Sequence, residues 1–339
     1  EAVLKGGLAG LDLVSGDGEL TVLTNKFSLD GWQQYVLPFR DFELSGGLKV
    51  LTSVKGNFRR LHEARVMHHL SVDGLSAKAR NGGEIRNVRG SIDLGPLDSE
   101  LKDIRFEVGQ TQFFVEGKML KQPDARWLIG FETPSLNLRD LALQVRKIGE
   151  ASRTAGADFD WGFVEGLTHR ILPGGEAVIE QVKGQIAFGG GKVIIPRLRF
   201  GAYKGVIFVR SAIDRSGQVP VTAIEVELER LSLARMSSAR ATPLMEGNLF
   251  AVASLKNEGI FDRGWLDRLR GEGSLSVTNG EFRTVNILGG LGRIAQLAPL
   301  GSFESGPTRF DDIRCDFEVG ERKIETENLV LVSDDFHIE

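Results

Sequence analysis

Cysteine is almost absent from the sequence, because Cys315 is the only one among the 339 residues. A lone thiol excludes an intrachain disulfide and a zinc site built from cysteines. Cys315 alternates with Ile313, Phe317 and Val319, as apolar residues do along one face of a strand. We therefore expect it to pack as a small hydrophobic residue rather than to react as a nucleophile.

Long apolar runs and prolines are also scarce. No stretch of about 18 apolar residues is present, so no helix of the sequence is expected to span a membrane. Only 10 prolines accompany 42 glycines, which favours a sheet with many tight turns over a disordered linker. The sequence has no initiator methionine and no signal-peptide pattern, and it stops at Glu339 inside an alternating segment. We expect a piece of a longer protein, with any membrane anchor outside it.

Motifs for chemistry are missing or incomplete. The net charge is −4, and no lysine- or arginine-rich stretch is interleaved with aromatic residues, so no nucleic-acid partner is expected. The glycines at 189–191 precede Lys192 and then Val193, where a phosphate loop needs Ser or Thr. Adjacent His68 and His69 would point to opposite faces of one strand, so they are not expected to share a metal. We expect no catalytic residue, no metal and no cofactor, and hence a protein that is not an enzyme.

Period-2 alternation of apolar and polar residues recurs along most of the chain. Such alternation predicts strands with one apolar and one wet face. Glycine-containing segments predict hairpin turns at 45–47, 81–83, 189–191 and 279–280, and Asn279-Gly280 is the strongest signal because a type I′ turn needs positive φ twice. We expect a mostly β fold, an elongated and curled antiparallel sheet that is groove-like and repeat-like, with a few short flanking helices. Strands should exceed about 45% of residues and helices should stay below about 20%.

The last third of the chain predicts one continuous apolar face. Period 2 places its apolar residues on the same side, and a register slip of one residue would expose all of them. An open groove and a closed core would show the same alternation, so the pattern leaves both possibilities open for this face. The candidate lipid-contacting residues are Leu275, Val277, Phe282, Val285, Phe317, Val319, Leu329 and Leu331, with Cys315 beside them.

Helical spacing replaces the alternation near the middle of the chain. The apolar positions at 138–148 form one stripe, with Asn137 as the expected N-cap and Gly149 as the expected end. A second helix is expected at 161–171. We expect both to pack on an end or edge of the sheet, and a lid over an apolar groove is the alternative. Shorter helices that flank the sheet are expected at 261–269 and 287–298.

Three segments follow from these patterns. Residues 1–135 are expected to form a β-repeat groove segment, and residues 136–175 a helical insertion. Residues 176–339 are expected to form a second β region that contains the two shorter helices.

Four motifs follow one another in the last hundred residues. They are MEGNLFAVASL at 245–255, LRGEGSLSVTNGEF at 269–282, FDDIRCDFEV at 310–319 and LVLVSDDFHI at 329–338. In this order they resemble the C-terminal region of the AsmA-like family, the AsmA-, TamB- and YhdP-type proteins of the Gram-negative envelope. The similarity covers residues 240–339, whereas earlier strands fit only as β-repeats of the same kind.

The resemblance implies a curled β-sheet with an apolar groove and brings no catalytic residues with it. It implies a periplasmic protein, anchored to the inner membrane by an N-terminal helix that this chain does not contain. Its implied cargo is phospholipid or another acyl lipid, carried between the inner and outer membranes for outer-membrane biogenesis. Two other functions stay open: a non-enzymatic envelope scaffold or outer-membrane assembly factor that offers sheet edges to partners, and a carbohydrate-active β-solenoid.

Overall fold

The computed structural model describes residues 4–9, 16–35, 40–120, 126–152, 178–237, 245–259, 264–283, 308–320, 322–333 and 337–338. Strands make up 72% of the described residues, which confirms the prediction of a mostly β, antiparallel fold with few helices. The chain divides into two compact units. Unit 1 comprises Glu1–Glu165 and Gln181–Ile194, and unit 2 comprises Gly166–Glu180 and Ile195–Glu339.

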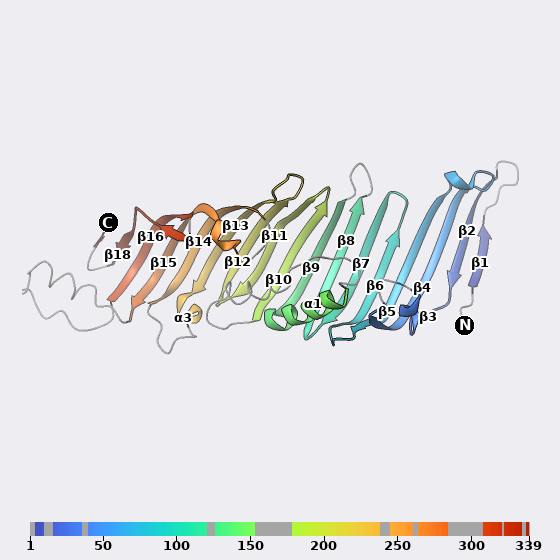
Figure 1. Cartoon of the computed structure of the whole chain (residues 1–339), viewed down its shortest axis with the longest axis horizontal. Helices are drawn as coiled ribbons and strands as arrows, with labels where there is room; N and C mark the ends of the chain where they lie inside the picture. The colour runs from blue at the N-terminus through green and yellow to red at the C-terminus, as the bar shows by residue number, and fades with distance from the viewer. Residues whose placement is uncertain are drawn as a thin grey trace, which may run out of the picture. The chain divides into compact units, whose positions relative to one another are not determined.

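Unit 1 is an open sheet in which strands that follow one another along the chain mostly lie side by side (Figure 1). Neighbours from β1 to β9 run antiparallel, β3 extends the edge of β4 next to β2, and β10 pairs with β9. The strands are β1 (Leu4–Ala9), β2 (Asp17–Thr24), β3 (Phe27–Ser28), β4 (Phe42–Asn57), β5 (Arg65–Ala79), β6 (Glu84–Leu94), β7 (Asp98–Val108), β8 (Thr111–Leu120), β9 (Arg126–Asn137) and β10 (Val178–Gly189).

Unit 2 repeats the same arrangement. Strands β12 to β16 are antiparallel neighbours, and the outer edge of β16 pairs with both β17 and β18. The boundaries between the units fall within β10, after Glu180, and within β11 (Lys192–Ala202), after Ile194. The remaining strands are β12 (Gly205–Asp214), β13 (Val221–Ser232), β14 (Met245–Glu258), β15 (Arg270–Phe282), β16 (Thr308–Gly320), β17 (Lys323–Glu325), β18 (Val330–Val332) and β19 (His337–Ile338), with the short helix α3 (Leu233–Met236) after β13.

Helix α1 (Leu138–Ser152) begins as the sequence predicts. The side-chain oxygen of Asn137 accepts hydrogen bonds from the N–H groups of Arg139 and Asp140, each at 3.1 Å, so Asn137 is the N-cap. The predicted end at Gly149 is wrong, because the helix continues to Ser152. One glycine costs a helix only about 1 kcal/mol relative to alanine, which packing of the adjacent turn readily offsets.

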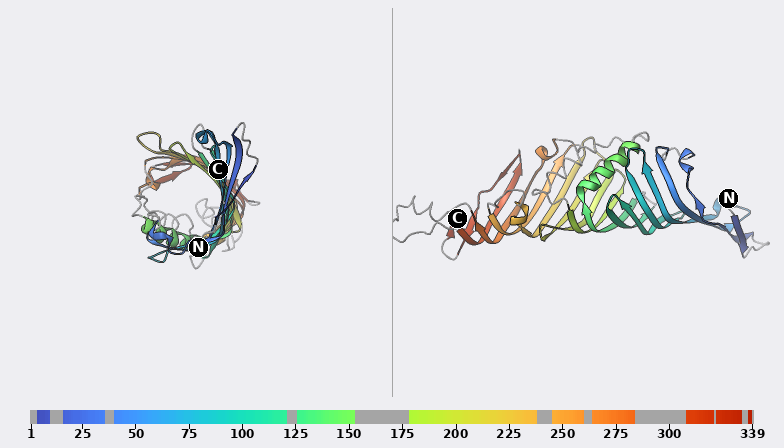
Figure 2. Two further views of the ribbon diagram at one scale, coloured as in Figure 1. Left: turned by 90° about the vertical axis from the view of Figure 1, so that its right-hand side faces the viewer. Right: turned by 90° about the horizontal axis from the view of Figure 1, so that it is seen from below.

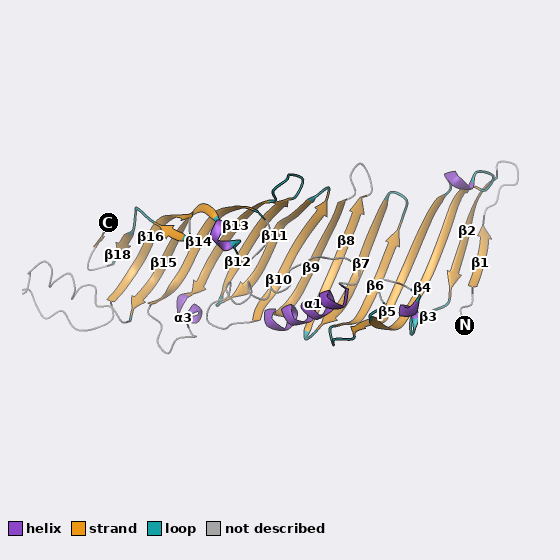
Figure 3. Ribbon diagram, in the orientation of Figure 1, coloured by secondary structure: helices purple, strands orange, loops and turns teal. Residues whose placement is uncertain are grey.

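Helix α1 lies across one row of strand ends in unit 1 (Figures 2 and 3). The side-chain amide of Asn81, in the β5–β6 turn, donates to the carbonyl of Lys147 at 2.6 Å. In the β7–β8 turn, the N–H of Gln110 donates to Asp140 Oδ2 at 2.8 Å. Ile148 adds an apolar contact with a buried cluster of Phe42, Ala77 and Ala79. The helix therefore packs on the end of the sheet, as expected for the helical insertion.

Two of the predicted hairpin turns instead lie inside single strands, each at a β-bulge of the sheet. Asn279-Gly280 lies within β15, where Asn279 has φ 53°, and residues 45–47 lie within β4, where Gly46 has φ 107°. The extra residue of the first bulge is in β15 itself, opposite Gly247 of β14, whereas the extra residue of the second is in β5, where Gly74 and Leu75 lie opposite Gly46. A bulge and a tight turn both need positive φ, so the local sequence signal is the same and long-range pairing decides. The turns predicted at 81–83 and 189–191 are confirmed.

The other predicted helices have mixed outcomes. The helix expected at 261–269 is wrong over its described part, which is a single 3-10 turn, η6 (Leu266–Arg268), followed directly by β15. The glycine at 264 and the early start of β15 leave no room for a longer helix there. The helices expected at 161–171 and 287–298 lie outside the described residues. None of the described helices combines the length and the apolar character that a bilayer crossing requires.

Candidate functional site

The sheet of unit 2 has one face built almost entirely from apolar residues. Directly paired residues on neighbouring strands point to the same side of a sheet, so the pairing registers assign the side chains to faces. Three rows cross β12 to β16 on this side, which we call the apolar face. The rows are Ile207, Leu228, Ala251, Leu275 and Cys315; Val209, Val226, Ala253, Gly273 and Phe317; and Ser211, Ile224, Leu255, Gly271 and Val319.

The opposite side, which we call the polar face, is rich in charge. Its rows are Phe208, Glu227, Val252, Ser274 and Asp316, and Arg210, Glu225, Ser254, Glu272 and Glu318. The alternation of the two faces is the arrangement that the sequence predicts, and the apolar residues are on the side with less solvent contact. Arg210 and Glu225 form an ion pair at 3.2 Å on this polar surface.

The apolar face has no second layer over its three rows in the part of unit 2 that the structure describes. The described strands contact their neighbours in the sheet, and α3 packs at one end of the face. At the other end Asn257, on the same side of β14 as Leu255, is buried and donates from Nδ2 to the carbonyl of Trp265 at 2.6 Å. Most side chains in the rows are half-buried rather than sealed, although Ile207 and Cys315 are each only 9% exposed. A soluble sheet normally covers its apolar face with another layer. This face is therefore the candidate binding surface.

A buried cluster closes one end of the apolar face. Val277 and Phe310 are each 3% exposed and Leu331 is 7% exposed, and Leu275 and Phe282 pack against them. Val277 and Phe282 are five residues apart, so a regular strand would send them to opposite faces. The bulge at Asn279 changes the alternation by one residue and brings both into the cluster.

The predicted lipid-contacting residues fall into three groups. Those that the structure gathers in or against the buried cluster are Leu275, Val277, Phe282 and Leu331. Phe317 and Val319 lie further along the apolar face and are half-buried. Leu329 is 52% exposed just before β18, and Val285 lies outside the described residues.

Two aromatic–glycine pairs on β15 and β16 were not anticipated as parts of the site. Phe310 lies opposite Gly280 and Phe317 lies opposite Gly273, and each ring occupies the space that a side chain at the glycine would fill. Phe310 is one of the three buried residues of the cluster, yet it was not among the candidates. The signal that could have identified it is a glycine directly opposite an aromatic residue on the adjacent strand. This signal can be read only when the register of the two strands is known.

Unit 1 carries an apolar face of the same kind. One row crosses six strands and consists of Val50, Leu70, Ile92, Leu101, Gly117 and Ile129. His68 lies on this side, 3.0 Å from the hydroxyl of Thr52, whereas His69 lies on the other side, 2.5 Å from Asp93 Oδ1. The two histidines therefore point to opposite faces, as predicted. No group of His, Cys, Asp and Glu suited to a metal ion occurs among the described residues.

A network of charged groups crosses the polar face of unit 1. Lys102 Nζ lies 2.9 Å from Asp93 Oδ2 and 3.2 Å from Glu100, while His69 contacts the other oxygen of Asp93. Hydrogen bonds from Lys102 and then His69 lower the pKa of Asp93, and bonds to Asp93 and Glu100 raise the pKa of Lys102. Ser71 Oγ lies 3.2 Å from His69 Nε2.

This network has the order of a Ser–His–Asp relay but not its surroundings. The side chains of His69 and Lys102 are 42% and 47% exposed on an open sheet surface. An acyl-transfer site also needs hydrogen-bond donors aimed at the developing oxyanion in a water-excluded cavity. The arrangement therefore ties β5, β6 and β7 together as a solvated ion network.

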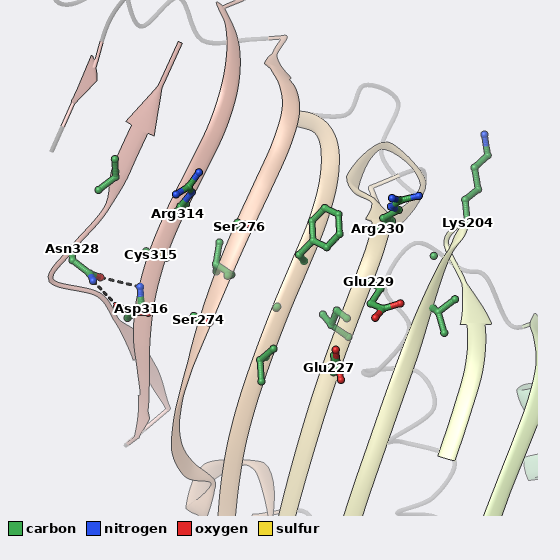
Figure 4. A pocket seen from close by; sticks show the side chains of 18 residues that line it. Lys204, Glu227, Glu229, Arg230, Ser274, Ser276, Arg314, Cys315, Asp316 and Asn328 are labelled. Atoms are coloured by element: carbon green, nitrogen blue, oxygen red, sulfur yellow. Dashed lines mark hydrogen bonds between the residues drawn. The ribbon is translucent and has the colours of Figure 1, made fainter. Parts of the chain in front are cut away.

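The polar face of unit 2 contains a pocket of about 840 Å³ (Figure 4). Charges of both signs surround it, with Glu227 and Glu229 on β13 near Arg230, and Asp316 on β16. Asn328 bridges to Asp316, donating from Nδ2 at 2.6 Å and accepting from the backbone N–H at 2.8 Å. A second hollow of about 680 Å³ adjoins it over β15 and β16. Most residues that line these hollows belong to the polar face, although Leu228, Ala251, Leu275 and Cys315 of the apolar face also line the larger one.

Comparison of the chain with models of known protein families, with curated proteins and with solved structures finds no match.

Proposed function

We propose that this chain binds the acyl chains of lipids along the apolar face of its sheet. The observation that carries the proposal is the set of three apolar rows across β12 to β16, over which no described element forms a second layer. An apolar surface of this extent in water is unfavourable, and such surfaces mark binding sites. A lipid tail would supply the missing layer.

The dimensions of the face suit an acyl chain. Strands lie about 4.8 Å apart, so the five strands from β12 to β16 span about 19 Å. The hydrocarbon core of a bilayer is about 30 Å thick, so one leaflet is about 15 Å deep. A tail of about 16 carbons would gain roughly 12 kcal/mol from burial, before the costs of ordering it.

The cellular role follows from the resemblance of residues 240–339 to AsmA-like proteins. We propose a periplasmic protein that carries phospholipid between the inner and outer membranes, with its anchor and membrane partners outside this chain. The proposal of acyl-chain binding rests on the apolar face, whereas the proposals of a periplasmic location and of transport between the two membranes rest on the resemblance alone.

Photo-crosslinking tests the binding surface directly. The purified protein would be mixed with a phospholipid that carries a photoreactive group at the end of its acyl chain, irradiated, digested and mapped by mass spectrometry. We expect adducts at apolar-face residues such as Leu275 and Phe317 and few at polar-face residues such as Ser274. A phospholipid labelled on its headgroup is the control and should give few adducts at Leu275. Equal labelling of both faces, or none, would contradict the proposal.

A further inference from the structure

One row on the apolar face of unit 1 contains hydrogen-bonding side chains. It runs across the paired strands from Val22 on β2 to Trp127 on β9 and includes Thr52, His68 and Ser99. We call it the mixed row. The neighbouring row on the same face, which begins at Val50, contains no polar side chain. The polar groups of the mixed row are therefore an exception that packing of the sheet does not require.

Thr52 and His68 form a fixed pair within the mixed row. They are direct partners on β4 and β5, both are half-buried, and Thr52 Oγ1 lies 3.0 Å from His68 Nδ1. When the hydroxyl donates to Nδ1, the neutral imidazole carries its proton on Nε2. Among the residues that the structure describes, Nε2 of His68 has no hydrogen-bond partner. Thr52 thus holds the ring while its second nitrogen stays available to a ligand.

Aliphatic side chains surround the imidazole on this face. Val66 and Leu70 flank His68 along β5, and Leu94 is its direct partner on β6. No Lys or Arg lies in the mixed row or in the row of Val50. A phosphate or carboxylate beside His68 would lose water without meeting a cation from these rows. An uncharged carbonyl oxygen needs only one donor, so it suits this position better.

The apolar face continues from His68 toward α1. Along β5 it passes through Leu70 and Val72 to Ala77, which belongs to the buried cluster that contacts Ile148 of α1. The nine residues from His68 to Ala77 span about 30 Å at about 3.4 Å per residue. One leaflet of a bilayer core is about 15 Å deep, so an acyl chain that starts at His68 ends before it reaches the helix.

We infer that His68 binds the ester carbonyl oxygen of an acyl lipid on the apolar face of unit 1. The Nε2–H group donates to the carbonyl oxygen, and Thr52 keeps the imidazole in the required tautomer and orientation. The acyl chain extends toward α1, and the alcohol part of the ester points toward the opposite strand ends. The inference rests on the proposed function, because it presupposes an acyl chain on this face, and it adds the class of lipid and its direction.

Two lysophospholipids that differ at one group test the inference. Lauroyl-lysophosphatidylcholine has an ester carbonyl, whereas its dodecyl ether analogue has a CH₂ group in the same place. Both would be titrated below their critical micelle concentrations. Affinity would be read by NMR from the backbone amides of Leu70 and Ile92, so that binding to unit 2 is not counted. The variants are His68→Phe and Thr52→Val, and the matched control is His69→Gln, the adjacent residue on the polar face.

We expect the parent to bind the ester about twofold to tenfold more tightly than the ether, which is the net effect of one hydrogen bond. His68→Phe should abolish this preference by weakening ester binding, Thr52→Val should reduce it, and His69→Gln should keep it. Circular dichroism would confirm that each variant is folded. A folded His68→Phe variant that keeps the preference would overturn the inference. Equal loss of both lipids in that variant would also overturn it, because His68 would then only support the shape of the face.

Imidazole nitrogen NMR of the parent gives a readout that needs no folded variant. The Nε2 signal of His68 should shift with the ester and not with the ether, and the signals of His69 should shift with neither. A parent that binds both lipids equally, with no change at His68, overturns the inference and leaves the proposed function standing. A parent whose Leu70 and Ile92 signals respond to neither lipid also overturns the inference, and the crosslinking experiment then decides the proposed function separately.

Discussion

The ring of Phe310 covers Gly280, its direct partner on the neighbouring strand. This relationship places a large aromatic side chain in the buried cluster with Val277 and Leu331. The glycine is needed because an added methyl group would meet the ring itself. The ring in turn covers strand backbone that a glycine leaves bare. Phe317 and Gly273 repeat the relationship further along the apolar face.

Replacing Gly280 with alanine should destabilise the fold. The new methyl group would force the Phe310 ring out of its position, and such overpacking costs about 1–3 kcal/mol. Gly320→Ala, in β16, is the matched control because no atom lies within 4 Å of the methyl group it would add. The free energy of unfolding, measured in urea, should fall for the first variant and not for the second. Equal effects of the two substitutions would count against a packed Phe310–Gly280 pair.

Leu275→Glu should separate an open face from a closed core. On an open face the carboxylate keeps contact with water, so we expect the variant to stay folded and to lose acyl-chain crosslinking. In a closed core an unpaired charge would cost several kcal/mol and the protein would unfold. Ser276→Glu is the control. Ser276 follows Leu275 directly in β15 but lies on the polar face, where its strand partner is Arg314. Thermal unfolding and crosslinking would be measured on the same samples.

Acid should weaken unit 1 through Asp93. Its pKa is held below the usual 3.8 by Lys102 and His69, so its carboxylate stabilises the fold at higher pH. That contribution is complete well above pH 3.8 and is lost as the pH falls through the lowered pKa of the folded state. The unfolding free energy of the parent should therefore decline below about pH 4 more steeply than that of Asp93→Asn. Parallel curves for the two proteins would refute this role.

The contribution of the N-cap residue Asn137 to the stability of α1 should be measurable with single substitutions. Asn137→Ala removes the oxygen that accepts from two backbone N–H groups, and the loss should be about 1 kcal/mol. Asn137→Ser keeps an acceptor and should retain most of the stability. Hydrogen exchange of the first turn of α1 should accelerate only in the alanine variant. A similar loss in both variants would mean that Asn137 acts through some contact other than the cap.

The sequence predicted the local alternation and the turns at 81–83 and 189–191, but not which segments pair with one another across the sheet. The residues that share the apolar face follow from period 2, and Leu275, Phe317 and Val319 lie where that pattern puts them. Asn279-Gly280 was misread because positive φ serves a turn and a bulge equally well. Only the pairing of β15 with strands on both sides distinguishes the two, and that information is non-local.

The errors within the site have the same origin. Phe282 joins the cluster only because of the bulge, whereas the prediction placed it there by assuming a turn. Phe310 was not selected because its importance depends on a glycine in the neighbouring strand. Leu329 alternates correctly with Leu331, but it precedes β18 and is exposed, since alternation alone does not determine where a strand starts.

The lack of a second layer over the described rows of the apolar face also bears on how such a sheet can change in length. Within each unit a strand is stabilised mainly by its two neighbours, so stability is close to a sum of adjacent pairings, as in repeat proteins. Insertion or loss of a whole hairpin would leave the remaining pairs intact. It would also keep every later turn at the same edge of the sheet, so the row of strand ends under α1 and the opposite row of strand ends would not exchange. Insertion or loss of a single strand would exchange the two rows. Growth of the sheet in steps of two strands is therefore the route that preserves its faces and its edges together.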